Sequence, residues 1–242
     1  DNTGSKTINI PDKIESFPVV AIQAEAFMGK DVSSIVIPGT VTQIGKNAFA
    51  NCKSLTSVFT LEGSTPVKIE EKAFESCILL KSFYGKNVGE LGAKAFSGCR
   101  ALESAIFDKG PTELNSGIFS SCGALARVYL GGIYNGSTVI GDKFFTGANA
   151  LKAIHIGGSI SDAAKDLLCK DTDGKDIRKI HKDTSLTFTV DTPSCENPAA
   201  VTITSSCDSR DDNNVPCSFN GWKLDSANSI PALGHDIIYT TP

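Results

Sequence analysis

The sequence predicts an α/β solenoid over most of the chain, followed by a small all-β module. One observation is a phenylalanine that recurs at intervals of 22, 25, 22, 23 and 26 residues. Another is a branched aliphatic residue five positions before each phenylalanine. A fixed period in the twenties is typical of a solenoid, in which one short unit stacks on its copies. The phenylalanines are Phe27, Phe49, Phe74, Phe96, Phe119 and Phe145, and the aliphatics are Ile22, Ile44, Ile69, Leu91, Leu114 and Ile140.

Two further positions recur after the phenylalanine. Cysteine follows three residues later at Cys52, Cys77, Cys99 and Cys122, and leucine follows six residues later at Leu55, Leu80, Leu102, Leu125 and Leu151. Since the cysteines share one internal position, we expect each to fill the same small buried niche as a free thiol. Strands in a stack lie about 4.8 Å apart, so a bridge between adjacent cysteines is the alternative.

Within one repeat, the spacing predicts a short helix, a strand and a turn. Four residues fall at i, i+4, i+8 and i+11, the spacing of one helix face: Ile44, Ala48, Cys52 and Leu55. Short apolar runs such as residues 35–37 predict strands, and Pro38-Gly39 marks a turn. Stacked copies should form a parallel sheet on one side and short helices on the other. We expect residues 5–182 to make one right-handed solenoid with six to eight strands.

Residues 35–55 carry the fullest repeat. An aliphatic strand leads through Pro38 and Ile44-Gly45 to Ala48-Phe49, Cys52 and Leu55. This pattern resembles the BspA-like class of leucine-rich repeats, and the resemblance covers about residues 5–157. The stretch from residue 10 to residue 27 resembles the first unit of that family, so we expect a natural cap at the N-terminus.

The repeat pattern weakens toward the C-terminus. Ile118 and Phe144 replace the alanine, and Ala148 replaces the cysteine. Residues 160–182 fit a degenerate closing unit. We therefore predict a leucine-rich-repeat solenoid with caps over residues 1–182.

Beyond residue 182, the sequence predicts a small β module over residues 183–242. Runs rich in Thr and Val at 186–190 and 200–204, with a further run at 237–240, predict strands. An immunoglobulin-like sandwich is one candidate form, although about sixty residues is short for one. The module either packs on the end of the solenoid or continues past Pro242 in the natural protein. Trp222 is expected in its core.

The remaining cysteines are Cys169, Cys195, Cys207 and Cys217. The last three could supply one disulfide, which leaves one thiol over unless Cys169 takes part. The sequence leaves their redox state open.

The composition argues against several classes of function. The net charge is -4 and the basic residues are scattered, so we expect no nucleic-acid partner. No apolar stretch reaches the ~20 residues that span a bilayer. His155, His181 and His235 lack metal-ligand spacing, and residues 171–176 fit a solvated turn better than a calcium loop. We expect no metal, no cofactor, no catalytic residue and a monomeric, non-enzymatic protein.

One column of residues favours binding. The middle residue of each predicted strand points away from the core, and four flanking outward positions are serines, Ser34, Ser57, Ser82 and Ser104. Exposed apolar and aromatic surface tends to mark an interaction site. The alternative is that these side chains pack on one another or that the tail covers them. Asn9 and Val36 begin the column, and the expected ligand-binding residues are Phe59, Tyr84, Ile106, Tyr129, His155 and His181.

The family resemblance implies a secreted or surface-exposed protein of a host-associated microbe, often an adhesin, and it brings no catalytic residues. We expect an extracellular or cell-surface binding protein that recognises a protein or glycan through the sheet face. A passive spacer that presents another module is the alternative, and a glycan-acting enzyme is the least favoured. A covered column would favour the spacer.

Overall fold

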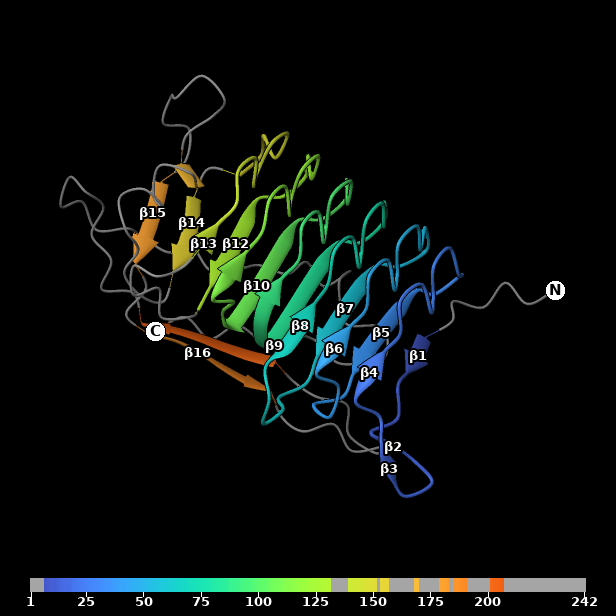
Figure 1. Cartoon of the computed structure of the whole chain (residues 1–242). Helices are drawn as coiled ribbons and strands as arrows, with labels where there is room; N and C mark the ends of the chain where they lie inside the picture. Colours follow the sequence, from blue (N-terminus) through green and yellow to red (C-terminus); the bar gives the residue numbers. More distant parts are fainter. Residues whose placement is uncertain are drawn as a thin grey trace.

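The computed structural model describes residues 7–131, 139–151, 153–156, 168–169, 179–182, 185–190 and 201–206. Its main feature is a parallel ladder of eight strands, which confirms the predicted sheet (Figure 1). Successive strands of the ladder come from successive repeats. They are β1 (Thr7–Asn9), β5 (Ser34–Ile37), β7 (Ser57–Thr60), β9 (Ser82–Leu91), β10 (Ser104–Lys109), β12 (Arg127–Leu130), β14 (Ala153–Ile156) and β15 (Lys179–Lys182).

A second parallel ladder carries the recurring aliphatic residues. It contains the C-terminal part of β9, so β9 belongs to both ladders. The spacing had assigned these aliphatics to helices, and that prediction is wrong. The other strands of the second ladder are β4 (Ala21–Ile22), β6 (Gln43–Ile44), β8 (Val67–Ile69), β11 (Glu113–Leu114) and β13 (Val139–Ile140).

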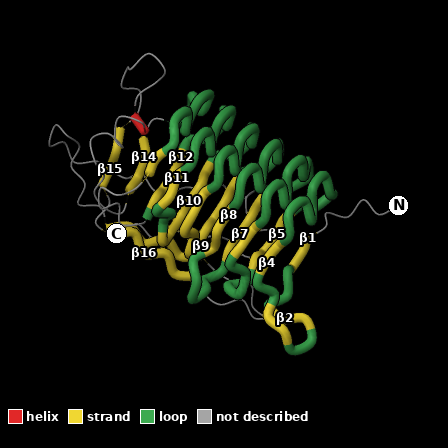
Figure 2. The backbone as a smooth tube through the Cα atoms, in the orientation of Figure 1, coloured by secondary structure: helices red, strands yellow, loops and turns green. Residues whose placement is uncertain are grey.

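The segments between the two ladders are turns rather than helices (Figure 2). In the described part of the chain, helix is confined to residues 168–169. The residues two positions before and two after each ladder phenylalanine have positive φ, as at Asn47 (56°) and Asn51 (61°) around Phe49. A left-handed residue interrupts an α-helix, because its backbone cannot continue the right-handed turn.

Hydrogen bonding in these turns alternates between local and inter-repeat partners. The Ala48 N–H donates to the Gly45 carbonyl three residues back, at 3.1 Å. The next N–H, that of Phe49, donates to Ala73 of the following repeat at 2.7 Å. In a helix both would donate four residues back within the same segment. The neighbouring repeat therefore satisfies backbone groups that a helix would satisfy internally.

The core lies between the ladders and the turns, and its centre is a stack of phenylalanine rings. Neighbouring rings are near parallel, with centroids 5.0 to 5.6 Å apart. Five of the six are buried as expected, whereas Phe27 is only partly buried. Phe27 is the first ring of the stack, so it has a partner on one side only. The stacked pairs run from Phe27 through Phe49, Phe74, Phe96 and Phe119 to Phe145.

The four repeat cysteines are free and fully buried, in agreement with the expectation of unbridged thiols. Each donates its S–H to the phenylalanine carbonyl of the preceding repeat. The Cys77 Sγ lies 3.1 Å from the Phe49 oxygen, and the Cys122 Sγ lies 3.1 Å from the Phe96 oxygen. Cys169 is also free and buried.

Two antiparallel hairpins complete the described residues. Strands β2 (Lys13–Ile14) and β3 (Phe17–Pro18) form a short hairpin near the N-terminus. Strands β16 (Ser185–Val190) and β17 (Val201–Ser206) pair where two strands of the β module were predicted. The other expectations for this region lie outside the described residues. They concern the strand at 237–240, Cys195, Cys207, Cys217, Trp222, His235 and the turn at 171–176.

Candidate binding surface

The backbone register places the whole predicted column in one line across the main ladder. Each member is the Cα partner of the next, as for Phe59 with Tyr84 and Ile106 with Tyr129. His155 continues the line and pairs with His181 of β15. The register that the sequence predicted is therefore present. In order the line is Asn9, Val36, Phe59, Tyr84, Ile106, Tyr129, His155 and His181.

The prediction that this column is exposed is wrong for its centre. The exposed fractions are 3% for Phe59, 8% for Tyr84, 5% for Ile106 and 3% for Tyr129. Ring stacking accounts for part of this burial, since the Phe59 and Tyr84 centroids are 4.7 Å apart at an interplanar angle of 14°.

Stacking alone does not explain the burial of this face. The outward serines Ser34 and Ser104 are also buried, and side chains this short cannot cover one another across strands. Burial of this face therefore extends from the column to the flanking serines. His155, near the C-terminal end of the column, keeps intermediate exposure.

A cluster of charged side chains lies where the strands of the main ladder end. The Lys86 Nζ of β9 lies 2.6 Å from the Asp108 Oδ2 of β10, and both side chains are largely shielded from solvent. Burial raises the pKa of Asp108 and outweighs the lowering by Lys86. Burial also raises the pKa of Tyr84, and the carboxylates of Asp108 and Glu62 add to this effect.

A groove of about 780 Å³ opens beside this cluster. It lies between the base of the β2–β3 hairpin and the loops that follow β5 and β7. Phe59 is the one member of the predicted column that lines it. The lining also includes hydroxyl groups, two carboxylates and Lys86. Its residues are Asp12, Pro18, Pro38, Gly39, Thr40, Thr42, Phe59, Thr60, Leu61, Glu62, Ser64, Thr65 and Lys86.

Sequence reasoning missed this groove, although one signal for it was present. The interval from Phe49 to Phe74 is 25 residues, three more than the preceding interval of 22. The longer interval contains the loop after β7, which forms one wall. The two walls approach closely at glycines, because a Cβ on Gly39 would lie 1.9 Å from the Glu62 carbonyl oxygen.

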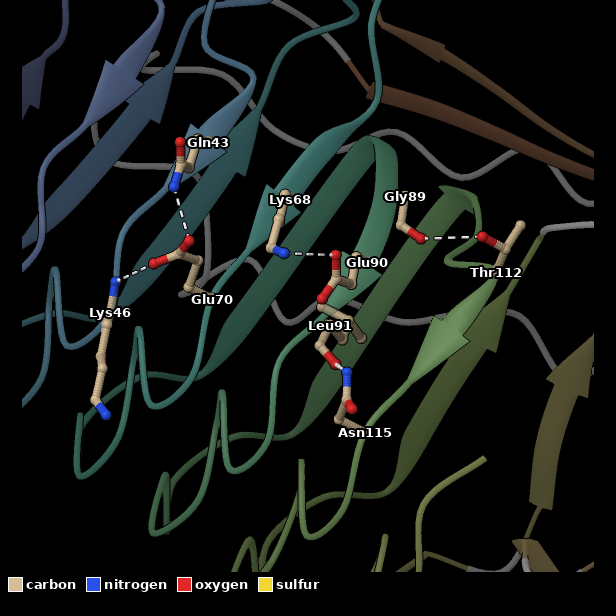
Figure 3. A network of polar contacts seen from close by, with 9 residues as sticks. All are labelled: Gln43, Lys46, Lys68, Glu70, Gly89, Glu90, Leu91, Thr112 and Asn115. Carbon is tan, nitrogen blue, oxygen red and sulfur yellow. Dashed lines mark hydrogen bonds and ion pairs between the residues drawn. The ribbon is translucent and has the colours of Figure 1, made fainter. Parts of the chain in front are cut away.

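The second ladder presents a different surface, on which polar side chains bind one another (Figure 3). Glu70 accepts hydrogen bonds from the Gln43 side chain at 2.7 Å and from the Lys46 backbone N–H at 3.0 Å. Lys68 and Glu90 form an ion pair of 3.0 Å. These polar groups are occupied within the chain, so we place the candidate site at the groove.

Among the described residues, no three His, Cys, Asp or Glu side chains are grouped so that they could hold a metal ion. None of the helical structure in that part is long and apolar enough to cross a bilayer.

Comparison with protein families gives one decisive match. The model of the BspA type leucine rich repeat region matches residues 20–152 in six copies, which is more than half of the chain. The chain belongs to this family. The repeats of a BspA-type protein therefore account for both ladders and the phenylalanine stack.

Two solved structures share the fold. A leucine rich repeat protein of T. pallidum is 25% identical, with a TM-score of 0.54 over 66% of this chain and 80% of the other. The pneumococcal vaccine antigen PcpA is 23% identical, with a TM-score of 0.50 over 64% of this chain and 40% of the other. A leucine rich cell surface protein of Faecalibacterium prausnitzii is 22% identical, with a TM-score of 0.47 over 83% and 54% of the two chains. No curated protein matches the chain.

Proposed function

We propose that this BspA-type chain is a binding module of a secreted or cell-surface protein, and that it holds a protein or glycan ligand in the groove beside Phe59. The observation that carries the proposal is the groove itself, which combines an aromatic ring, threonine and serine hydroxyls and two carboxylates. Such a mixture of an apolar base with a few polar groups is typical of ligand sites.

The proposal changes the role of the predicted column. Phe59, although only 3% exposed, lines the groove and would bound a ligand there, whereas the similarly buried Tyr84, Ile106 and Tyr129 pack the sheet face. His155 and His181 remain candidate ligand contacts at the far end of the column.

A binding role accounts for the groove better than catalysis does. A glycosidase with two carboxyl groups needs one with a raised pKa as the acid. Asp12 and Glu62 both line the groove, but the hydrogen bond from Lys109 lowers the pKa of Glu62. The Lys109 Nζ lies 2.6 Å from the Glu62 Oε1, so this carboxyl is kept ionised.

A passive spacer is the second candidate, and one observation favours it. The buried column removes the exposed aromatic surface that first argued for binding. A spacer would bind nothing in the groove, so the two functions differ in a measurable way.

The test is an array of glycans and extracellular proteins probed with the wild-type chain and two variants. Thr65→Arg places a long side chain in the groove, and Thr146→Arg makes the same change at an exposed turn of another repeat. We expect specific ligands whose binding Thr65→Arg abolishes and Thr146→Arg preserves, with both variants folded. If the ligands bind Thr65→Arg as tightly as wild type, the groove is not the binding site. If no ligand binds at all, the spacer function is favoured.

A further inference from the structure

The β2–β3 hairpin presents two large apolar side chains to solvent. Ile14 and Phe17 are partners across the hairpin and are 63% and 73% exposed. Val20, just after the hairpin, is 52% exposed. Figure 1 shows the hairpin projecting from the N-terminal part of the solenoid. Solvation of such a cluster is unfavourable, and apolar area of this kind gains free energy when a partner covers it.

The base of the hairpin is attached to the solenoid. The Asp12 carbonyl accepts hydrogen bonds from the Val19 N–H at 2.9 Å and from the Thr40 hydroxyl at 3.3 Å. Glu15 has a φ of 56°, which a two-residue hairpin loop accommodates at its first central position. The two side chains are thus presented on a defined strand pair, which lowers the entropy cost of docking.

We infer that Ile14 and Phe17 insert into an apolar cleft on a protein partner whose rim is basic. Asp12 and Glu15 place two carboxylates around the apolar pair, against the single ammonium of Lys13. All three are exposed, and the whole chain has a net charge of -4. A basic rim would complement this surface and steer association.

The same charges argue against other occupants. An anionic membrane attracts polybasic segments, and this hairpin carries more acidic than basic groups. A second copy on a two-fold axis would bring like carboxylates together. A protein partner is the occupant that the chemistry fits.

The inference rests on the proposed binding function, because the hairpin and the groove are continuous. Asp12 and Pro18, at the base of the hairpin, line the groove. A partner anchored on the hairpin would therefore extend along the groove toward Phe59. Hairpin and groove variants nevertheless separate the two claims.

The experiment compares the full chain with two double variants and with Thr65→Arg. Ile14→Ser with Phe17→Ser removes the apolar tip. Ile78→Ser with Leu79→Ser removes a matched exposed pair, 40% and 49% exposed, from a distant turn. Binding of each protein to an array of purified extracellular proteins is measured. Phosphatidylcholine–phosphatidylglycerol vesicles test for membrane binding, and sedimentation equilibrium tests for self-association.

We expect at least one protein on the array to bind, with affinity that falls as salt is raised. The tip variant should lose about tenfold or more in affinity and the control about twofold or less, because buried aromatic anchors dominate interfaces. The inference is overturned by tip-dependent vesicle binding, by tip-dependent self-association, or by protein ligands that only Thr65→Arg disrupts. That last result leaves the groove function standing. An array without protein ligands overturns the inference, and the glycan array then decides whether the groove binds a ligand.

Discussion

The ring of each ladder phenylalanine stabilises two repeats at once. Phe96 stacks on Phe74 at 5.2 Å and on Phe119 at 5.5 Å, and it is fully buried. Phe27 stacks on one ring only and is partly buried. Phenylalanines at the same repeat position therefore contribute different amounts to stability, depending on their place in the stack.

Replacement of Phe96 by Ala should lower the free energy of unfolding by about 3–5 kcal/mol, since a large core side chain is lost and a cavity remains. Phe27→Ala should cost clearly less, because its ring is already partly in water. Urea unfolding of both variants measures the difference. Equal losses would show that position in the stack does not matter.

The surroundings of Cys52, Cys77 and Cys122 raise the pKa of each thiol and hold it neutral. Burial raises the pKa of Cys122 from 9.0 to about 12. The neighbouring Cys77 thiol, followed by burial, raises the pKa of Cys52. Because the thiolate is the reactive form, these cysteines should resist modification while the chain is folded.

The raised pKa of Cys122 predicts a loss of stability at alkaline pH. Below pH 9 the thiol is neutral in both states, and its contribution is fully present. As pH rises from 9 toward about 12, the unfolded chain releases the proton and the folded chain retains it, so unfolding becomes easier. Urea unfolding between pH 8 and 11 should show a steeper decline for wild type than for Cys122→Ala. Parallel curves would contradict this assignment.

At the scale of one turn, adjacent repeats approach so closely that a side chain is excluded. The residue after each second-ladder aliphatic alternates between a polar residue and glycine. A Cβ on Gly92 would lie 2.5 Å from the Glu70 carbonyl carbon. The Gly92 N–H also donates to Ile69 at 2.7 Å, so the contact is part of the ladder. The alternating residues are Gln23, Gly45, Glu70, Gly92, Asn115 and Gly141.

Gly92→Ala should therefore destabilise the protein by about 1–3 kcal/mol, the usual cost of overpacking. Gly123→Ala is the control, because a Cβ there meets no atom within 4 Å. Thermal unfolding should show a clear loss for the first variant and almost none for the second. Equal melting temperatures would mean that the backbone adjusts without cost.

Across the whole molecule, the covered sheet face joins successive repeats. Phe59, Tyr84, Ile106 and Tyr129 come from four different repeats and are all nearly buried. In a solenoid, each repeat is stabilised by its neighbours, so a column shared by several repeats contributes at every interface.

Tyr84→Ser with Tyr129→Ser should consequently lower the melting temperature by several degrees, because two buried rings are lost and 1 kcal/mol corresponds to roughly 2–4 °C at this size. An exposed binding column would instead leave the melting temperature unchanged. Calorimetry distinguishes these outcomes, and an unchanged transition would restore the predicted open face.

The repeat period was sufficient to predict the stack and the register. Residues at one repeat position must lie side by side once the units stack, so Phe49 over Phe74 and Tyr84 beside Ile106 follow from counting along the chain. The spacing did not distinguish a helix from turns. That depends on positive φ at residues such as Asn51 and on N–H groups that bond to the next repeat.

Exposure and the groove also lay beyond the sequence. A period states which side chains are neighbours and not what else lies over them, so the aromatic column was expected in solvent and is buried. The groove joins a hairpin, loops and a strand from four successive repeats, from Asp12 to Lys86. Such a site forms through contacts between residues far apart in the chain, whereas periodicity reports only the contacts that every repeat shares.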